Sequence, residues 1–249
     1  MTVSRERLAR WFDQTLEVER FSDYCPNGLQ VQGREQIAHL VSGVTASATL
    51  IREAVSAGAD ALVVHHGYFW RGEDPRLIGV KGARIAALMR ADLNLFAFHL
   101  PLDAHPVLGN NACLAQRLGL PVHGRGGDRE LIFWADLEAP ASAQGLASQL
   151  EQRLGRAPML VGAAGPIVRV AWCTGAAQDA IEQAAALGAQ AFISGEISER
   201  TTHLARELGL AYLAAGHHAT ERDGVQALGE AAAAEFGLRH TFIDDPNPV

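Results

Sequence analysis

The chain has 249 residues and a formal net charge of −7, with 48% hydrophobic and 20% charged residues. This composition is ordinary for a globular protein, and the length suits one large α/β domain or two small ones. The acidic balance argues against a protein that binds the phosphate backbone of nucleic acids, because such proteins normally have a basic surface.

The sequence also bears on location. No apolar run approaches the roughly 20 residues that a membrane-spanning helix needs. The N-terminal residues lack the apolar core and small-residue cleavage site of a secretory signal. Cys25, Cys113 and Cys173 are far apart and outside any CxxC pair, which fits thiols in a reducing compartment. We therefore expect a cytoplasmic protein with no membrane association.

The first half of the chain alternates between predicted helices and strands. Ser4 is a candidate cap for a first helix whose apolar residues share one face. Residues 22–33, rich in Pro, Asn and Gly, predict a loop. Strands are expected at 40–44, 61–64 and 93–98, and helices at 48–57, 81–91 and 110–118. This βαβαβ order favours a parallel sheet with helices on its faces.

A second alternating run follows 119–129, a glycine-rich stretch that we take as the boundary between halves 1–124 and 125–249. Its expected strands are 131–137, 168–173, 191–193, 210–213 and 239–243, and its expected helices are 142–154, 177–187, 198–208 and 220–236. Segment 53–67 aligns without gaps on 183–197. Each is a helix, a Gly-Ala turn, a strand and a polar strand end. We therefore predict two similar three-layer α/β half-domains that face each other, with the last helix and strand as candidates to pack back on the first half.

Metal-competent side chains gather where three of these strands end. Ligands bind at the carboxyl ends of strands in open α/β sheets. Imidazole and carboxylate are the usual donors for catalytic divalent metals. Three imidazoles and two carboxylates exceed what one catalytic ion needs, so the pattern predicts two ions per chain, held between the half-domains. The five predicted ligands are His65, His66, Asp103, His217 and Glu221.

Each cluster also has an ordinary interpretation. His65 and His66, taken alone, would more often be a surface pair beside a turn. The His217-x-x-x-Glu221 spacing puts both groups on one helix face, but it arises often by chance. Asp103 follows a stiff Leu-Pro-Leu segment and is a candidate bridging carboxylate, as is Glu221.

Further polar residues near these strand ends are candidates for supporting roles. His99 could be a ligand, a general acid/base or a buried hydrogen-bonded residue, and we rank acid/base catalysis or support of a ligand first. Glu196 is a candidate substrate contact or support for a ligand, and His218 and Thr220 are candidates to orient one. Ordinary structural or surface roles are expected for His39, His105, His123, His203 and His240.

Taken in order, these motifs resemble the Nif-three-like (YbgI) family. The resemblance is carried by Asp23-Tyr-Cys-Pro-Asn-Gly, Val-Val-His65-His66-Gly, His99-Leu-Pro-Leu-Asp103, Ser194-Gly-Glu196, Gly216-His217-His218-Ala-Thr-Glu221 and the closing Phe242-Ile-Asp-Asp-Pro-Asn-Pro-Val. It runs from about residue 20 to the last residue. It implies the same five ligands and a ring-shaped homohexamer whose metal sites line the inner cavity. Many bacterial members are labelled GTP cyclohydrolase 1 type 2 homologues. The inserted middle domain of longer members is lacking.

We therefore predict a dinuclear-metal-dependent hydrolase that opens the ring of a nucleotide or related heterocycle, as a GTP cyclohydrolase does. Two cations would activate water for attack on an electrophilic carbon, C8 of guanine if GTP is the substrate, and His99 would pass a proton to the departing nitrogen. Zinc, iron, manganese, cobalt and nickel all suit the donors. With no GxxxxGK[ST] loop, arginines or backbone amides would bind a triphosphate.

Two other functions remain open at this point. One is a non-catalytic, metal-binding adaptor or regulatory protein that forms a ring. The other is a ring that threads nucleic acid, which the acidic charge disfavours.

Overall fold

The computed structural model describes residues 1–162 and 165–249. The chain divides into two compact units, unit 1 (Met1–Gly109 and Gly224–Pro246) and unit 2 (Asn110–Asp223 and Asn247–Val249). Their bounds differ from the predicted halves 1–124 and 125–249, because the helix that starts at Asn110 belongs to unit 2 and the C-terminal strand belongs to unit 1.

Unit 1 is built on a five-stranded sheet in the order β13-β4-β5-β6-β2. Strands β13, β4, β5 and β6 are parallel, and β2 is antiparallel to β6. The loop predicted over 22–33 is wrong for residues 28–31, which form β2 at the edge of the sheet. The strands are β2 (Gly28–Val31), β4 (His39–Thr45), β5 (Ala61–His66), β6 (Asn94–Ala97) and β13 (Arg239–Phe242), and a separate pair is formed by β1 (Val3–Ser4) and β3 (Gln36–Ile37).

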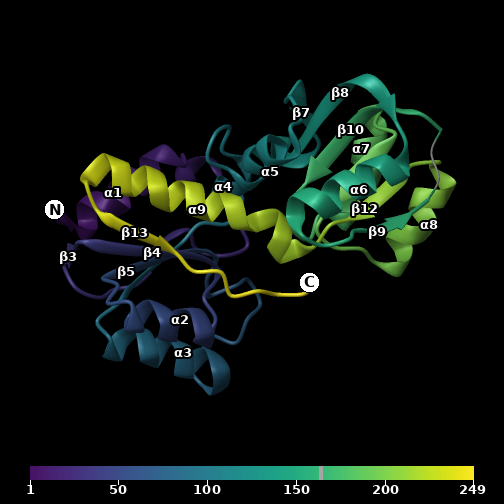
Figure 1. Ribbon diagram of the computed structural model, residues 1–249. Helices are drawn as coiled ribbons and strands as arrows, with labels where there is room; N and C mark the ends of the chain where they lie inside the picture. Colours follow the sequence, from purple (N-terminus) through teal and green to yellow (C-terminus); the bar gives the residue numbers. More distant parts are fainter. Residues whose placement is uncertain (163–164) are drawn as a thin grey trace. The chain divides into compact units, whose positions relative to one another are not determined.

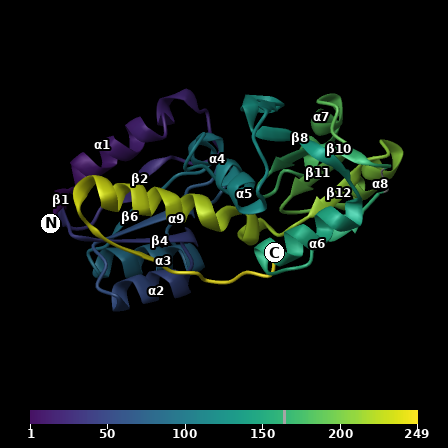
Figure 2. The same ribbon diagram turned by 45° about the horizontal axis from the view of Figure 1, so that its top comes forward.

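Helices cover both faces of this sheet (Figure 1). Successive side chains of a strand point to opposite faces. Along β5, Leu62 and Val64 pack with α2 and α3, whereas Ala61 and Val63 pack with α1 and the later turns of α9. Figure 2 shows the same three layers. The helices are α1 (Arg5–Thr15), α2 (Ala48–Ser56), α3 (Gly79–Arg90), the short α4 (Leu100–Ala104) and α9 (His217–Phe236), with η1 (Val18–Arg20) after α1.

Unit 2 has a six-stranded sheet in the order β7-β8-β10-β11-β12-β9. Helices α5 and α6 pack on one face and α7 and α8 on the other. Its strands are β7 (Gly124–Gly126), β8 (Ile132–Ala141), β9 (Met159–Val161), β10 (Ile167–Cys173), β11 (Ala191–Ser194) and β12 (Ala211–Ala214). Its helices are α5 (Asn110–Leu118), α6 (Ala143–Leu154), α7 (Ile181–Ala186) and α8 (Glu199–Glu207), with η2 (Asp128–Glu130) and η3 (Gln178–Ala180).

The two units share a central pattern. Each has three parallel strands, β4-β5-β6 in unit 1 and β10-β11-β12 in unit 2, bordered by a short antiparallel strand, β2 or β9. Each sheet carries helices on both faces, which confirms the predicted α/β class. β5 and β11 are the central strands of the two triplets, as the alignment of 53–67 on 183–197 requires.

Two further findings concern membrane-spanning helices and the cysteines. Among the residues described, no helix combines the length and the apolar character needed to cross a membrane. Cys25, Cys113 and Cys173 are all buried and are not joined in disulfides.

Candidate metal centre

The carboxyl end of β5 carries a pair of adjacent imidazoles. His65 is fully buried, and its Nδ1 lies 2.8 Å from the carbonyl oxygen of Phe98. Because a carbonyl only accepts, Nδ1 of His65 carries the hydrogen, and Nε2 is the nitrogen that can bind a metal. Nδ1 of His66 lies 3.1 Å from Oγ1 of Thr45 on the neighbouring strand. Both rings are thus oriented by partners at Nδ1, the usual arrangement of metal-binding histidines.

The end of β6 adds a carboxylate and a third imidazole. Asp103, on the short helix α4, is 7% exposed, and its Oδ1 lies 3.5 Å from Nε2 of His65. One ring nitrogen each from His65, His66 and His99 lie within 4.8 Å of one another. Unit 1 therefore brings together the four candidate residues that the sequence placed in it.

His99 is held by a carboxylate from a distant loop. Asp23 Oδ1 lies 2.8 Å from Nδ1 of His99, and its Oδ2 accepts from the Leu100 N–H at 2.9 Å. Asn27 Oδ1 accepts from the His99 N–H at 2.7 Å. Burial acts to raise the pKa of Asp23, but hydrogen bonds from His99 and Asn27 outweigh it and lower the pKa to about 2. Asp23 is therefore charged at neutral pH and directs Nε2 of His99 away from itself.

A strained turn after β5 places an aromatic ring beside these histidines. Phe69 has φ of 67°, a left-handed conformation that is rare for a bulky residue. The Glu73 carboxylate holds this turn by accepting from the N–H groups of Phe69 and Trp70 at 3.0 and 3.2 Å. The Trp70 ring centroid lies 5.0 Å from that of His99 and 6.1 Å from that of His66. Such strain is found mainly where function requires a fixed geometry.

Unit 2 holds a second cluster at the start of α9. Nε2 of His217 lies 3.1 Å from Oε2 of Glu221, and Nδ1 lies 2.7 Å from Oε1 of Glu196. Burial acts to lower the pKa of His217, but hydrogen bonds to Glu221 and Glu196 and their charges raise it to about 9. The buried carboxylate of Glu221 thus has a cationic imidazolium beside it. This environment also suits a divalent cation, which would displace the proton.

Two small features shape the surroundings of Glu221. A Cβ on Gly175 would lie 2.1 Å from Oε1 of Glu221, so only glycine leaves room for the carboxylate. Thr220 Oγ1 accepts from the Gly175 N–H at 3.1 Å and donates to the Gly216 carbonyl at 2.9 Å. Thr220 therefore fixes the loop beside Glu221. The predicted neighbour His218 is 9% exposed, and its N–H donates to the carbonyl of Val249.

The sequence analysis anticipated Glu196 and Thr220 but missed other residues that orient or adjoin the clusters. Asp23 and Asn27 belong to one of the motifs that carry the resemblance, but no spacing links them to His99, which is 76 and 72 residues away. Thr45, Trp70 and Gly175 carry no local signal at all. The cysteine in the same motif is not activated, because burial and the charge of Asp23 raise the pKa of Cys25 to about 12.

Four of the five histidines expected to be ordinary have structural contacts. Nδ1 of His105 accepts from the N–H groups of Val107 and Leu108. Nδ1 of His123 accepts from the Asp136 N–H at 3.0 Å. His39 and His240 hydrogen-bond with the hydroxyls of Thr241 and Ser42 within unit 1. None of these four histidines belongs to a metal-competent group among the described residues. They therefore lie outside the two clusters of candidate groups, which are His65, His66, His99 and Asp103 in unit 1 and His217, Glu221 and Glu196 in unit 2.

Comparison with known proteins identifies the family. The model of the Duf34/NIF3 (NGG1p interacting factor 3) family matches residues 3–248. A protein of Allochromatium vinosum is 54% identical over 251 residues, covering 100% of this chain and 98% of its own length. A protein of Escherichia coli (strain K12) is 52% identical over 249 residues, covering 99% and 100%. Both are named GTP cyclohydrolase 1 type 2 homolog.

A solved structure supports the same assignment. It is described as "Structural genomics, protein ybgI, unknown function", and it matches with a TM-score of 0.96 and 50% identity, covering 99% of this chain and 100% of that one. The family match and these relatives extend over essentially the whole chain. The chain therefore belongs to the Duf34/NIF3 family.

Proposed function

We propose that the chain is a metal-dependent hydrolase whose two clusters together bind two divalent ions. The ligands in this proposal are His65, His66, Asp103, His217 and Glu221. The observation that carries it is the pair of adjacent imidazoles with partners at Nδ1, one of them beside the Asp103 carboxylate. The raised pKa of His217 adds support, because the carboxylates of Glu221 and Glu196 that raise it would also attract a divalent cation.

Divalent ions, when bound, polarise water and substrate oxygens for hydrolysis. The chain's own contribution in this proposal is proton transfer at Nε2 of His99. In ring opening, the oxygen of water becomes the carbonyl oxygen on the electrophilic carbon, and the bond from that carbon to one ring nitrogen breaks. The two protons of the water go to the two ring nitrogens, and His99 takes up one of them and delivers it to the departing nitrogen. Asp23, at Nδ1 of the same ring, fixes its tautomer and orientation.

We propose a nucleotide or a related heterocycle as the substrate. The relatives' name, GTP cyclohydrolase 1 type 2 homolog, points to this class. The Trp70 ring beside His99 supports it, and so does Tyr24, whose ring centroid lies 6.3 Å from that of His99 and which is 49% exposed. Aromatic rings in such positions bind planar heterocycles by stacking or edge contacts.

The test compares turnover with metal content. Protein reconstituted separately with zinc, manganese, iron, cobalt or nickel is assayed against a panel of nucleotides. Asp103→Ala should lose turnover while keeping the wild-type circular dichroism spectrum. His99→Ala should keep its ions and lose turnover by roughly 10²–10⁴-fold, the usual contribution of general acid/base catalysis. Loss of metal from His99→Ala would instead make His99 a ligand.

The same samples test the non-catalytic alternative. We propose, from the family resemblance, that the chain self-associates into a homohexameric ring, and its mass in solution measures this. A protein that shows no turnover with any metal or nucleotide, but whose assembly depends on bound metal, would be the adaptor or regulatory protein rather than the hydrolase.

A further inference from the structure

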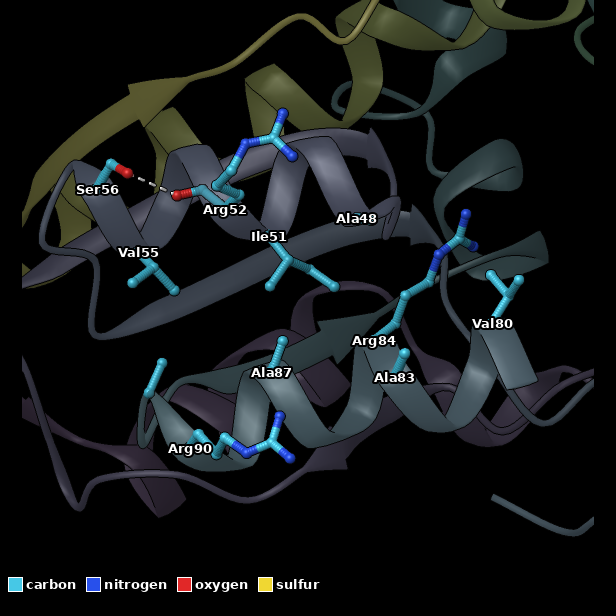
Figure 3. A pocket seen from close by; sticks show the side chains of 11 residues that line it. Ala48, Ile51, Arg52, Val55, Ser56, Val80, Ala83, Arg84, Ala87 and Arg90 are labelled. Atoms are coloured by element: carbon cyan, nitrogen blue, oxygen red, sulfur yellow. Dashed lines mark hydrogen bonds between the residues drawn. The ribbon is translucent and has the colours of Figure 1, made fainter. Parts of the chain in front are cut away.

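A groove separates α2 from α3 on one face of the unit 1 sheet (Figure 3). Its volume is about 710 Å³. Helix α3 lines it with Ala83 and Ala87, and Ala91, which caps α3, follows at the same four-residue spacing, so that the three alanines share one face. Helix α2 lines it with Ile51 and Val55. Because the alanines are small, the two helices leave between them a space that larger side chains would fill.

Apolar side chains remain exposed along this groove. Val55 is 43% exposed and Val80 is 68% exposed. Leu77 and Ile78, directly before α3, are also exposed. Exposed apolar surface around a groove often marks a binding site, because contact between apolar side chains and water is unfavourable.

The charge of the groove is opposite to that of the whole chain. Arg52, Arg84 and Arg90 line it, and no acidic residue does. Within the described residues, none of these three arginines takes part in an ion pair. Nε of Arg84 is buried and has no hydrogen-bond partner there. In a chain with a net charge of −7, the groove is therefore a local cationic site with an unsatisfied donor.

We propose that this groove binds a small amphiphilic anion. Its apolar chain or ring would occupy the space between Ile51, Val55 and the alanines, and its carboxylate or phosphate would accept hydrogen bonds from Arg84. The volume lies within the range of about 300–1,000 Å³ that is typical of small-molecule pockets. This volume and the buried Nε of Arg84, which has no hydrogen-bond partner among the described residues, favour a small anionic molecule over a second copy of the chain.

Calorimetric titration of the whole protein with decanoate and with decyl phosphate tests the proposal. At least one should bind saturably, with one site per chain. The neutral decanamide should bind at least tenfold more weakly than decanoate if decanoate binds. Arg84→Met keeps the length of the side chain but removes its charge, and it should weaken binding of the anion by at least tenfold. Arg10→Met, at an exposed arginine of α1, is the matched control and should leave binding unchanged.

Substitutions that fill the groove provide a second, independent test of the proposal. Ala87→Trp, and the smaller change Ala83→Leu as a second variant, should block binding without changing the mass of the protein in solution. The proposal is overturned if neither anion binds saturably, or if binding survives in a folded groove-filling variant. It is also overturned if such a folded variant reduces the mass of the assembly, because a second copy of the chain would then be the occupant.

Discussion

At the scale of single residues, each candidate group is oriented by a partner from another part of the chain. The partner of His65 is a backbone carbonyl after β6, that of His99 is the carboxylate of Asp23, and that of His217 is Glu196. In each case the partner engages Nδ1. Metal binding or proton transfer at these rings would therefore take place at Nε2, which in His217 lies 3.1 Å from Oε2 of Glu221.

The Asp23 contact predicts a pH-dependent contribution to stability. Because the pKa of Asp23 is lowered from 3.8 to about 2, its charged form stabilises the folded protein above about pH 4, and this contribution is lost as the pH falls through about 2. Asp23→Asn should reduce the free energy of unfolding at neutral pH by about 1–3 kcal/mol, the usual effect of losing hydrogen bonds to a charged group. Urea denaturation at a series of pH values measures the difference from wild type.

The difference in unfolding free energy between wild type and Asp23→Asn should shrink as the pH falls from about 4 toward about 2. A difference that stays constant over this range would contradict the stabilising role of the charged Asp23.

Asp13 is a control whose stability effect should change with pH in the opposite direction. Burial and the charge of Glu19 raise the pKa of Asp13, so its charged form is unfavourable in the folded state. Asp13→Asn should therefore gain stability relative to wild type as the pH rises.

Gly175 supplies a second prediction at this scale. Its φ of 68° is strained for other residues, and a Cβ there would lie 2.1 Å from Oε1 of Glu221. Gly175→Ala should displace the Glu221 carboxylate and reduce metal binding, as measured by titration with zinc or manganese.

Gly209→Ala is the matched control, since its φ is 62° and a Cβ there meets nothing within 4 Å. The control should cost about 1–2 kcal/mol of stability from backbone strain and keep the metal. Equal metal affinities in the two variants would contradict the role given to Gly175.

At the scale of elements, the parallel strands could be predicted from sequence, including β13 at the edge of the unit 1 sheet, whereas the antiparallel edge strands β2 and β9 could not. β5 and β11 are short apolar runs between helical segments, and this pattern is visible locally. β2 begins at Gly28 in a Pro-Asn-Gly stretch typical of a loop, and it exists because it pairs with β6, far away in the chain. β9 pairs with β12 in the same way. The candidate ligands follow predictable strands, whereas Asp23 and Asn27 lie in the loop that leads into β2.

The packing of α9 on β13 gives a prediction for these elements. Glycine to alanine inside a helix normally stabilises it by about 1 kcal/mol. At Gly229, however, a Cβ would lie 2.3 Å from Nε2 of His240, which lies 2.8 Å from Oγ of Ser42. Gly229→Ala should therefore lower the free energy of unfolding, by about 1–3 kcal/mol from overpacking. In a Ser42→Ala background, where the ring is no longer held, the same change should cost less. Thermal melting of the four proteins measures this, and a higher melting temperature for Gly229→Ala would contradict the packing account.

At the scale of the whole molecule, the candidate ligands are divided between the two compact units. His65, His66 and Asp103 belong to unit 1, and His217 and Glu221 belong to unit 2. The matching triplets of parallel strands explain this division. The candidate groups of unit 1 lie at or after the carboxyl ends of β5 and β6, and those of unit 2 lie after β11 and β12. We propose that both sets act together as one dinuclear centre.

Elemental analysis of protein purified without chelators or nickel affinity, and then fully reconstituted, measures the number of ions in this centre. We expect two ions per chain. Glu221→Gln, which keeps the size of the side chain but removes its charge, should lose at least one of them. His123→Ala, at a histidine outside both clusters, should keep both. A content that never exceeds one ion per chain, or a loss of metal from His123→Ala as complete as from Glu221→Gln, would contradict the account.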